Sequence, residues 1–237
     1  MDGIVTNYNE PMQIIRNNRD EYSISEESIG NLTYVDVSDL RYGKVKRIFD
    51  VVFSLVSVAL LLVPFGIISL IIYIDDPGNV LFKQERIGLH GKKFVLYKFR
   101  TMKLDTPKYM STVDLQNAEP CVTRVGQILR KYSLDELPQL INILKGDMSL
   151  IGPRPLIENE RQIHACRMHF GVYNIRPGIT GLAQINGRDL VKPAEKIQWD
   201  VKYLENFGFL QDLRIFFATI PKAFSGKDVI GSMKAAE

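Results

Sequence analysis

The sequence predicts a mainly helical α+β protein, in which an N-terminal apolar membrane helix precedes a small domain with a β-hairpin and amphipathic helices. Three observations support this prediction. Residues 51–74 form an uninterrupted stretch without a charged side chain. Two short strand-like runs follow it, joined by the tripeptide Leu-His-Gly, which suits a hairpin. Later segments repeat apolar residues at the spacing of an amphipathic helix.

Residues 1–43 are expected to form a flexible acidic arm. Residues 1–40 contain two basic and eight acidic side chains, a balance of −6, and too few large apolar groups to build a core of their own. Because the whole chain carries +3, residues 41–237 carry +9. A basic body favours phosphate-rich partners such as nucleotides, anionic lipid head groups or nucleic acid. No nucleic-acid-binding motif is present, so nucleic acid is not an expected partner.

Residues 44–75 form the predicted membrane segment. The 24 uncharged residues would make a helix of roughly 36 Å, enough to cross a bilayer core of about 30 Å. Pro64 lies near the middle and favours a break or kink. Basic residues flank both ends, so the positive-inside rule gives no orientation. These residues alone support a spanning helix and a re-entrant helix that breaks and returns about equally.

Three charged residues mark the entry to this segment. Lys46 and Arg47 are expected to lie among lipid phosphates. Asp50 would fit a helix N-terminus, where the helix dipole favours a negative charge.

Residues 76–237 are expected to form one domain after the membrane segment. The runs VLFKQERIG and KKFVLYKFRTM predict the hairpin, and polar residues 103–120 predict a loop. Residues 122–131 suit a short helix. A second helix is predicted to end at Gly146, because apolar residues recur at i, i+3, i+4 and i+7 before it. The final stretch, from Trp199 onward, is typical of amphipathic helices that pack in a core or lie at a membrane interface.

The stretch SLDELPQL places two acids before an apolar helix. Ser133 and Glu136 have the spacing of a capping box, in which each side chain satisfies a backbone N–H of the other residue. On that signal alone a helix cap is favoured over chemistry for Asp135 and Glu136. If Pro138 is the first helical residue, however, the acids lie outside the helix and the capping box fails.

Three loops rich in Gly, Pro and Arg follow: SLIGPRPL, RPGITGLAQ and INGRD. Proline fixes backbone shape, glycine lets the main chain approach a ligand, and arginine forks onto phosphate oxygens. Three such loops close together on a basic body indicate a phosphate-binding site. The chain has no Walker A or GxGxxG loop, and its two cysteines have no zinc-binding spacing.

Several long motifs, taken in order, resemble the bacterial sugar transferase family, the monotopic phosphoglycosyl transferases. They are KRIFD, FKQERIGLHGKKFVLYKFRTM, LRKYSLDELPQLINILKGDMSLIGPRPL and RPGITGLAQINGRD. The resemblance covers residues 46–224. It implies transfer of a phospho-sugar from a UDP-sugar to undecaprenyl phosphate, with release of UMP. In the family this is the first membrane step in making capsule, exopolysaccharide, O-antigen or glycoprotein glycans.

The acid pair matches the family's catalytic residues. The resemblance implies that Asp135 attacks the β-phosphate to form a covalent aspartyl phospho-sugar. Glu136, together with Asp135, would hold Mg²⁺. The substrate-binding positions implied by the same match are Lys98, Arg100, Arg130, Arg154, Arg176, Gln184, Arg188 and Asp200. The membrane-entry positions are Lys46, Arg47, Asp50 and Pro64.

The resemblance also implies a location and partners. The family's membrane helix is re-entrant, which places the catalytic domain on the cytoplasmic face of the bacterial inner membrane. The family breaks this helix at a Ser-Pro pair, whereas Val63 precedes Pro64 here. Expected partners are membrane lipid, downstream glycosyltransferases and a second copy in a homodimer. The GRD at residues 187–189 favours an N-acetylated amino-sugar, and a non-catalytic membrane-anchored scaffold is the competing hypothesis.

Overall fold

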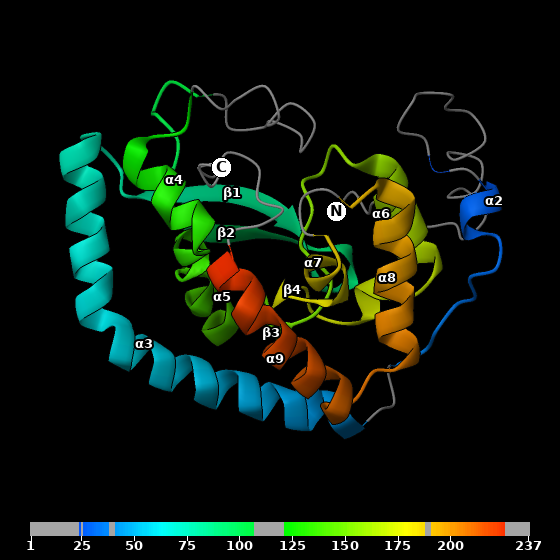
Figure 1. Ribbon diagram of the computed structural model, residues 1–237. Helices are drawn as coiled ribbons and strands as arrows, with labels where there is room; N and C mark the ends of the chain where they lie inside the picture. Colours follow the sequence, from blue (N-terminus) through cyan, green and yellow to red (C-terminus); the bar gives the residue numbers. More distant parts are fainter. Residues whose placement is uncertain (1–23, 25, 38–40, 107–120, 188–190, 226–237) are drawn as a thin grey trace.

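The computed structural model describes residues 24, 26–37, 41–106, 121–187 and 191–225. In chain order its main elements are α2 (Glu26–Ile29), α3 (Arg41–Asp75), β1 (Leu81–Ile87), η1 (Leu89–Gly91), β2 (Lys93–Phe99), α4 (Arg124–Lys131), η4 (Leu134–Glu136), α5 (Gln139–Lys145), β3 (Ser149–Ile151), α6 (Arg161–His169), η5 (Val172–Asn174), β4 (Gly178–Thr180), α7 (Leu182–Ile185), α8 (Pro193–Glu205) and α9 (Phe209–Ser225). The predicted mainly helical architecture with one antiparallel hairpin is confirmed. Figure 1 shows α3 along the lower and left edges, with the hairpin above it and α8 on the opposite side.

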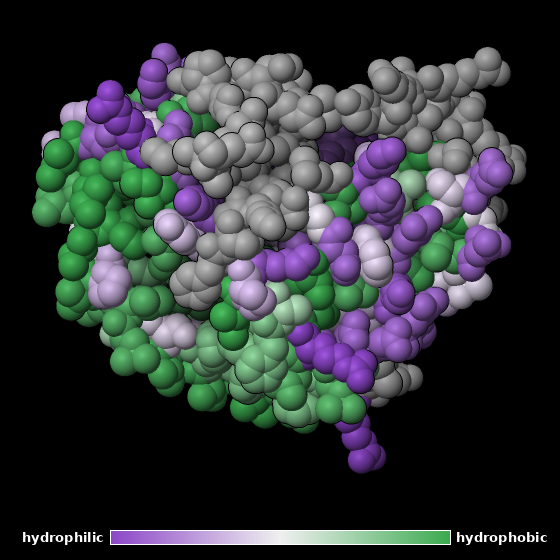
Figure 2. Space-filling model, viewed as in Figure 1, coloured by the Kyte–Doolittle hydropathy of each residue, from purple (hydrophilic) through white to green (hydrophobic). Residues whose placement is uncertain are grey.

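Helix α3 is long and apolar enough to cross a membrane, and 6% of its most apolar window is buried. It is one helix with Pro64 inside, and Figure 1 shows a pronounced bend in it. Proline removes a backbone donor and clashes with the preceding turn, which accounts for a bend. Leu60 is 75% exposed, and hydrophobic side chains cover the lower and left edges of the molecule in Figure 2. An apolar surface of this extent favours a membrane over water.

The entry residues of α3 make polar contacts with the domain. Lys46, at 9% exposure, forms an ion pair with Asp212 of α9. Arg47 donates to two main-chain carbonyls in the last turn of α5, at 2.7 and 3.3 Å, and so caps that helix. Asp50 lies inside α3, not at its start, and accepts from the backbone N–H of Leu150 at 3.1 Å. Lys46 thus lies in a buried internal ion pair and not among lipid phosphates, and Asp50 lies inside a helix and not at its N-terminus, because the buried face of α3 needs polar partners in the protein.

The hairpin and the two following helices form as the sequence predicts. Strands β1 and β2 pair from Leu81↔Phe99 to Ile87↔Lys93. The turn between them places His90 at φ 55, which the short Leu-His-Gly connection requires. Helix α4 begins after Thr123, whose side chain accepts from a backbone N–H in the first turn. Helix α5 ends at Gly146 with φ 94, a left-handed cap that glycine adopts without strain.

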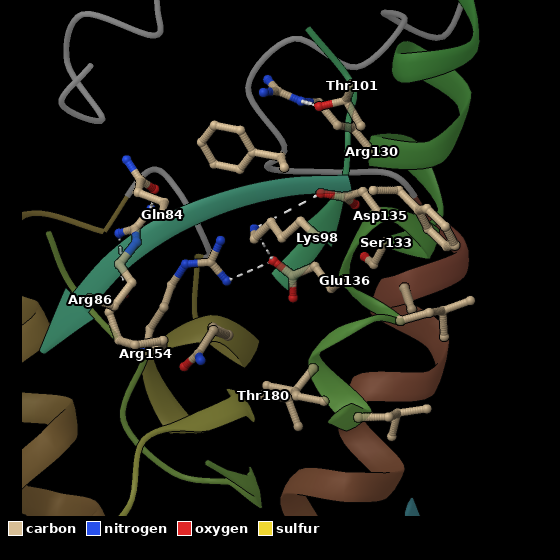
Figure 3. Close-up of a pocket in the computed structure, with 18 of the residues that line it drawn as sticks. Gln84, Arg86, Lys98, Thr101, Arg130, Ser133, Asp135, Glu136, Arg154 and Thr180 are labelled. Atoms are coloured by element: carbon tan, nitrogen blue, oxygen red, sulfur yellow. Dashed lines mark hydrogen bonds and ion pairs between the residues drawn. The ribbon is translucent and has the colours of Figure 1, made fainter. Parts of the chain in front are cut away.

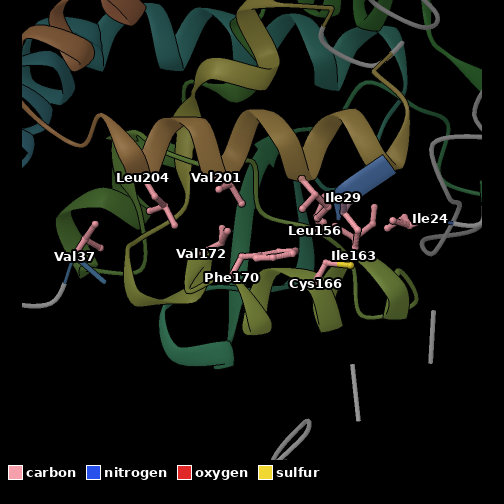
Figure 4. Close-up of a cluster of buried hydrophobic side chains, with 11 residues drawn as sticks. Ile24, Ile29, Val37, Leu156, Ile163, Cys166, Phe170, Val172, Val201 and Leu204 are labelled. Atoms are coloured by element: carbon pink, nitrogen blue, oxygen red, sulfur yellow. The ribbon is translucent and has the colours of Figure 1, made fainter. Parts of the chain in front are cut away.

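The described part of the N-terminal arm packs against the domain. Ile24, Ile29 and Val37 are buried in a cluster with side chains of α6 and α8 (Figure 4). Gln198 of α8 donates to the main chain of Ser28 at 2.7 Å. The arm builds no core of its own, as expected, but completes that of the domain. Residues 26–37 thus contact the domain, while the flexibility of the arm stays a prediction.

Two of the loops predicted to bind phosphate contain strands that the sequence did not reveal. Strands β3 and β4 pair in parallel, with Ser149 opposite Gly178. A Cβ on Gly178 would lie 2.1 Å from the backbone nitrogen of Gly152, so only glycine fits at this crossing. These glycines therefore serve the approach of two backbone segments to each other. The parallel pair supports the loop that carries Arg154.

Candidate active site

One cavity of about 1180 Å³ brings most of the predicted site residues together. Of the predicted positions, those that line it are Lys98, Arg100, Arg130, Asp135, Glu136, Arg154 and Gln184. Figure 3 shows Lys98 on β2, the acid pair on η4 and Arg154 on a separate loop converging on one point. The cavity is therefore assembled from segments far apart in the sequence.

The acid pair lies in a turn before α5 and is not a helix cap. Ser133 opens this turn in the left-handed conformation, with φ 57, and makes no side-chain capping bond. Pro138 comes directly before α5, so both acids lie outside that helix. The capping-box interpretation is therefore wrong, because the turn directs the carboxylates into the cavity.

Basic side chains surround the two carboxylates. Lys98 donates to Glu136 Oε1 at 2.8 Å, and its Nζ lies 3.9 Å from Asp135 Oδ2. Arg154 Nη1 lies 3.1 Å from the same Glu136 oxygen. Arg130 is held nearby, with its Nε donating to Thr101 at 2.9 Å. This arrangement places two negative and several positive groups where a diphosphate would meet compensating charge.

Asp135 differs from its neighbour in electrostatics. Burial raises the pKa of Asp135, and the adjacent Glu136 raises it further, while Lys98 acts most strongly in the opposite direction. The residue is 8% exposed. A carboxylate held with little water around it is a stronger nucleophile than a solvated one.

Strand β2 and helix α5 are fixed to each other by a residue that sequence reasoning missed. Asn142 is fully buried, and its amide accepts from Tyr97 N at 3.0 Å and donates to Val95 O at 2.6 Å. It thereby joins the strand that carries Lys98 to the helix that follows the acid pair. In the sequence Asn142 is a single polar residue within an apolar helix, and no local pattern predicts its hydrogen bonds to a distant strand.

Two buried polar groups of the cavity have unused hydrogen-bonding atoms. Arg100 is 6% exposed and bonds to Asp76, just after α3, yet its Nε and Nη1 have no partner in the described part of the chain. Gln184 is 9% exposed, and neither of its amide atoms has one there. Buried polar groups are normally satisfied by protein, water or ligand, so these atoms are available to a bound molecule.

Three predicted positions are not part of the cavity lining. Two of them lie elsewhere in the structure, and the third is outside the described residues. Arg176 donates to Gly146 O at 2.8 Å and lies outside the cavity lining. Asp200 forms a buried ion pair with Arg167, at 2.7 and 2.8 Å, and is also absent from the lining. Arg188 lies outside the described residues, as do Asp189 and most of the predicted loop at 103–120. For Asp200 the correction follows from burial, since the carboxylate is 2% exposed.

The cavity also contains polar residues that sequence reasoning did not select. Gln84 and Arg86 come from β1, and Glu160 precedes α6. Burial and the neighbouring Arg154 lower the pKa of Arg86 to about 10, so it remains charged at neutral pH. The motif FKQERIG contained a signal in its spacing, because Gln84 and Arg86 are two residues apart on a strand and so share one of its faces.

The cavity also has an apolar lining, contributed by α3, the turn after η4, α5, β3 and α9. These apolar residues are Phe53, Leu61, Leu137, Leu140, Leu150, Ile151, Phe216, Ile220 and Ala223. Thr180 and Thr219, bonded to each other at 2.8 Å, lie at its side. One cavity therefore combines the acid pair Asp135 and Glu136 with cationic and apolar lining residues.

Metal binding has a limited set of protein ligands. Among the described residues, no group of three or more His, Cys, Asp or Glu side chains is arranged to hold a metal ion. Mg²⁺ commonly takes one or two carboxylates and obtains its remaining ligands from substrate phosphates and water. Asp135 and Glu136 fit that type of site, in which the substrate completes the coordination.

The protein thus has a long apolar helix and a cavity whose cationic side chains suit phosphate groups. Residues 41–226 match the family described as Bacterial sugar transferase, and the chain belongs to the bacterial sugar transferase family.

Named relatives cover most of the chain. The exopolysaccharide production protein ExoY of Rhizobium meliloti is 40% identical over 76% of this chain and 85% of its own length. The sugar transferase EpsL of Bacillus subtilis is 42% identical over 78% of this chain and 89% of its own. The UDP-glucose:undecaprenyl-phosphate glucose-1-phosphate transferase of Escherichia coli is 38% identical over 77% of this chain and 40% of its own length.

Proposed function

We propose that this protein transfers a sugar 1-phosphate from a UDP-sugar to undecaprenyl phosphate, through a covalent intermediate on Asp135, and releases UMP. The observation that carries the proposal is a single cavity that holds the acid pair together with cationic and apolar lining residues. The names of two relatives, from Escherichia coli and Caulobacter vibrioides, specify this type of reaction for glucose. The first product would then be extended by downstream glycosyltransferases.

In the first step, an oxygen of Asp135 attacks the β-phosphorus of the donor. The bond from that phosphorus to the bridging oxygen breaks, and UMP leaves with the oxygen and its electron pair. Lys98 and Arg154, both in contact with Glu136, stabilise the negative charge that develops on the phosphate oxygens. Mg²⁺, bound by Glu136 with Asp135 and the diphosphate, would supply further charge neutralisation.

In the second step, a phosphate oxygen of the lipid attacks the same phosphorus. The bond to Asp135 breaks, its carboxylate is regenerated, and the product is a polyprenyl diphosphate sugar. The bond between the sugar C1 and its oxygen is not broken in either step, so the anomeric configuration is retained. The apolar lining between α3 and α9 suits the hydrocarbon chain of the acceptor, and the protein would act at the cytoplasmic face of the inner membrane.

The decisive experiment measures UMP release from a panel of UDP-sugars, with Mg²⁺ and polyprenyl phosphate. Wild-type protein should turn over repeatedly with the lipid and stop after one turnover without it, leaving a phospho-sugar on Asp135. The Asp135→Asn variant should form neither product nor adduct. Normal turnover by this variant would refute the nucleophile, and binding of UDP-sugars without UMP release would support the scaffold hypothesis.

The re-entrant topology is a separate part of the proposal. Single cysteines introduced at Lys44 and Pro77, in a background that lacks Cys121, report the two ends of α3. Both should be labelled by a membrane-impermeant thiol reagent only from the cytoplasmic side. Labelling from opposite sides would establish a spanning helix.

A further inference from the structure

The polar end of the cavity contains a side-chain cluster that the reaction steps do not use. Arg86 donates through Nη2 to Gln84 at 2.6 Å and through Nη1 to the carbonyl of Pro155 at 3.3 Å. Its Nε is buried and has no partner among the described residues. Glu160, which lines the same end and is among the charges that act on Arg86, has a buried Oε2 that is likewise unpartnered there. Figure 3 shows Arg86 and Gln84 beside Arg154.

The two unused atoms have opposite requirements. The Nε of Arg86 can only donate a hydrogen bond, and the carboxylate oxygen of Glu160 can only accept one. A phosphate group only accepts, so it would satisfy the arginine but be repelled by the glutamate. A uracil ring offers one N–H between two carbonyls, and these carbonyls would face the carboxylate. A ring with adjacent hydroxyls both donates and accepts, and satisfies both atoms at once.

We propose that Arg86 and Glu160 bind the hydroxyls of a sugar ring of the donor, with Gln84 holding Arg86 in place. This inference rests on the proposed function and adds a specificity subsite to it. The ring is either the transferred sugar or the ribose of the nucleotide. Both belong to the same molecule and present the same chemistry, so binding measurements must separate them.

The test is isothermal titration of the full-length, detergent-solubilised protein in an Asp135→Asn background, which forms no covalent adduct, with UDP and with the UDP-sugar that binds best, in the presence of Mg²⁺. Glu160→Gln preserves shape but replaces one acceptor, and it should weaken UDP-sugar binding about tenfold. Arg86→Lys should act in the same direction. Glu158→Gln is the matched control, because Glu158 lies two residues away in an exposed ion pair with Lys93 and should bind like wild type.

The two ligands identify the ring. If the transferred sugar is bound, Glu160→Gln weakens binding of the UDP-sugar and leaves UDP unchanged. If the ribose is bound, Glu160→Gln weakens the binding of UDP too. The affinities of the proteins with and without the Glu160→Gln change then become equal for 2′-deoxy-UDP or 3′-deoxy-UDP, which lack one ribose hydroxyl. Wild-type affinity in both variants, or a loss that persists with both deoxy nucleotides, would overturn the subsite alone. A wild-type protein that binds neither UDP nor any UDP-sugar would overturn the proposed function with it.

Discussion

Replacing Asp200 by asparagine tests whether this residue supports the structure or binds the substrate. Family resemblance places Asp200 at the substrate, whereas the structure buries it against Arg167, which also donates to the carbonyl of Arg154 at 2.8 Å. Burial opposes the charge on Arg167, but Asp200 and Tyr173 more than offset it, so the pKa of Arg167 is raised. Asp200→Asn therefore leaves a buried cation without its counter-charge.

The magnitude follows from the geometry of the pair. The two side chains are 3% and 2% exposed and share two contacts shorter than 3 Å. Breaking a buried ion pair by removing one partner costs about 3–5 kcal/mol. The amide oxygen of asparagine can still accept one of the hydrogen bonds, so we expect about 3 kcal/mol. For a chain of this size that lowers Tm by about 6–12 °C.

The assay is thermal unfolding in detergent, followed by fluorescence of Trp199, the one tryptophan of the chain and the neighbour of Asp200. The donor KM is then measured at a temperature where both proteins are folded. The KM of Asp200→Asn should stay close to that of wild type, because Arg167 can still hold the carbonyl of Arg154. Glu158→Gln, which breaks an exposed pair, should shift Tm by less than 4 °C, corresponding to at most about 1 kcal/mol.

A double variant separates charge burial from positioning. Arg167→Met with Asp200→Leu removes both charges, and such replacements are often neutral or stabilising. It should recover most of the lost stability, yet the carbonyl of Arg154 loses its donor, so donor binding should weaken. An unchanged Tm in Asp200→Asn together with a strongly raised KM would refute this reasoning and return Asp200 to the substrate.

Three further predictions concern the acid pair and the membrane helix. Because burial raises the pKa of Asp135, its ionised form destabilises the fold at neutral pH, and this destabilisation fades as the pH falls through the raised pKa. Asp135→Asn should thus raise Tm by about 2–4 °C at pH 7 while it abolishes turnover; a lower Tm would contradict the buried charge. Lys98 lowers the pKa of Asp135, so Lys98→Gln should move the acid limb of the kcat profile to higher pH, and an unmoved limb would show that another group controls it. Pro64→Ala restores a backbone donor and raises helix propensity by about 3 kcal/mol, which favours a straight helix. Thiol labelling should then show more molecules with the two ends of α3 on opposite faces of the membrane. An unchanged labelling pattern would mean that other residues determine the topology.

Elements specified by nearby residues could be predicted from the sequence. The hairpin β1–β2 needs only two alternating runs and a short turn, and α5 needs only an apolar stripe and Gly146. The long apolar helix follows from composition alone. Each of these signals lies within the element itself, so no tertiary contact is needed to read it.

Features that depend on distant contacts could not be predicted in the same way. Strands β3 and β4 are three residues each and exist because they pair across 26 intervening residues. The partners of Lys46 and Arg47 are parts of α9 and α5 that no local pattern connects to α3. A basic residue beside an apolar stretch is typical of lipid contact, and only packing reveals an internal acceptor.

The acid pair shows why a site can be recognised where local rules fail. A capping box would have stabilised the start of α5, but the turn instead holds Ser133 in a left-handed conformation and buries the carboxylate of Asp135. Around it, Arg100 and Gln184 keep buried atoms without partners in the described part of the chain. Each of these features is unfavourable for folding, and they occur together around one cavity. A ligand that supplies hydrogen bonds to these atoms and charge to this cavity would remove these penalties, which is the physical reason to expect the substrate there.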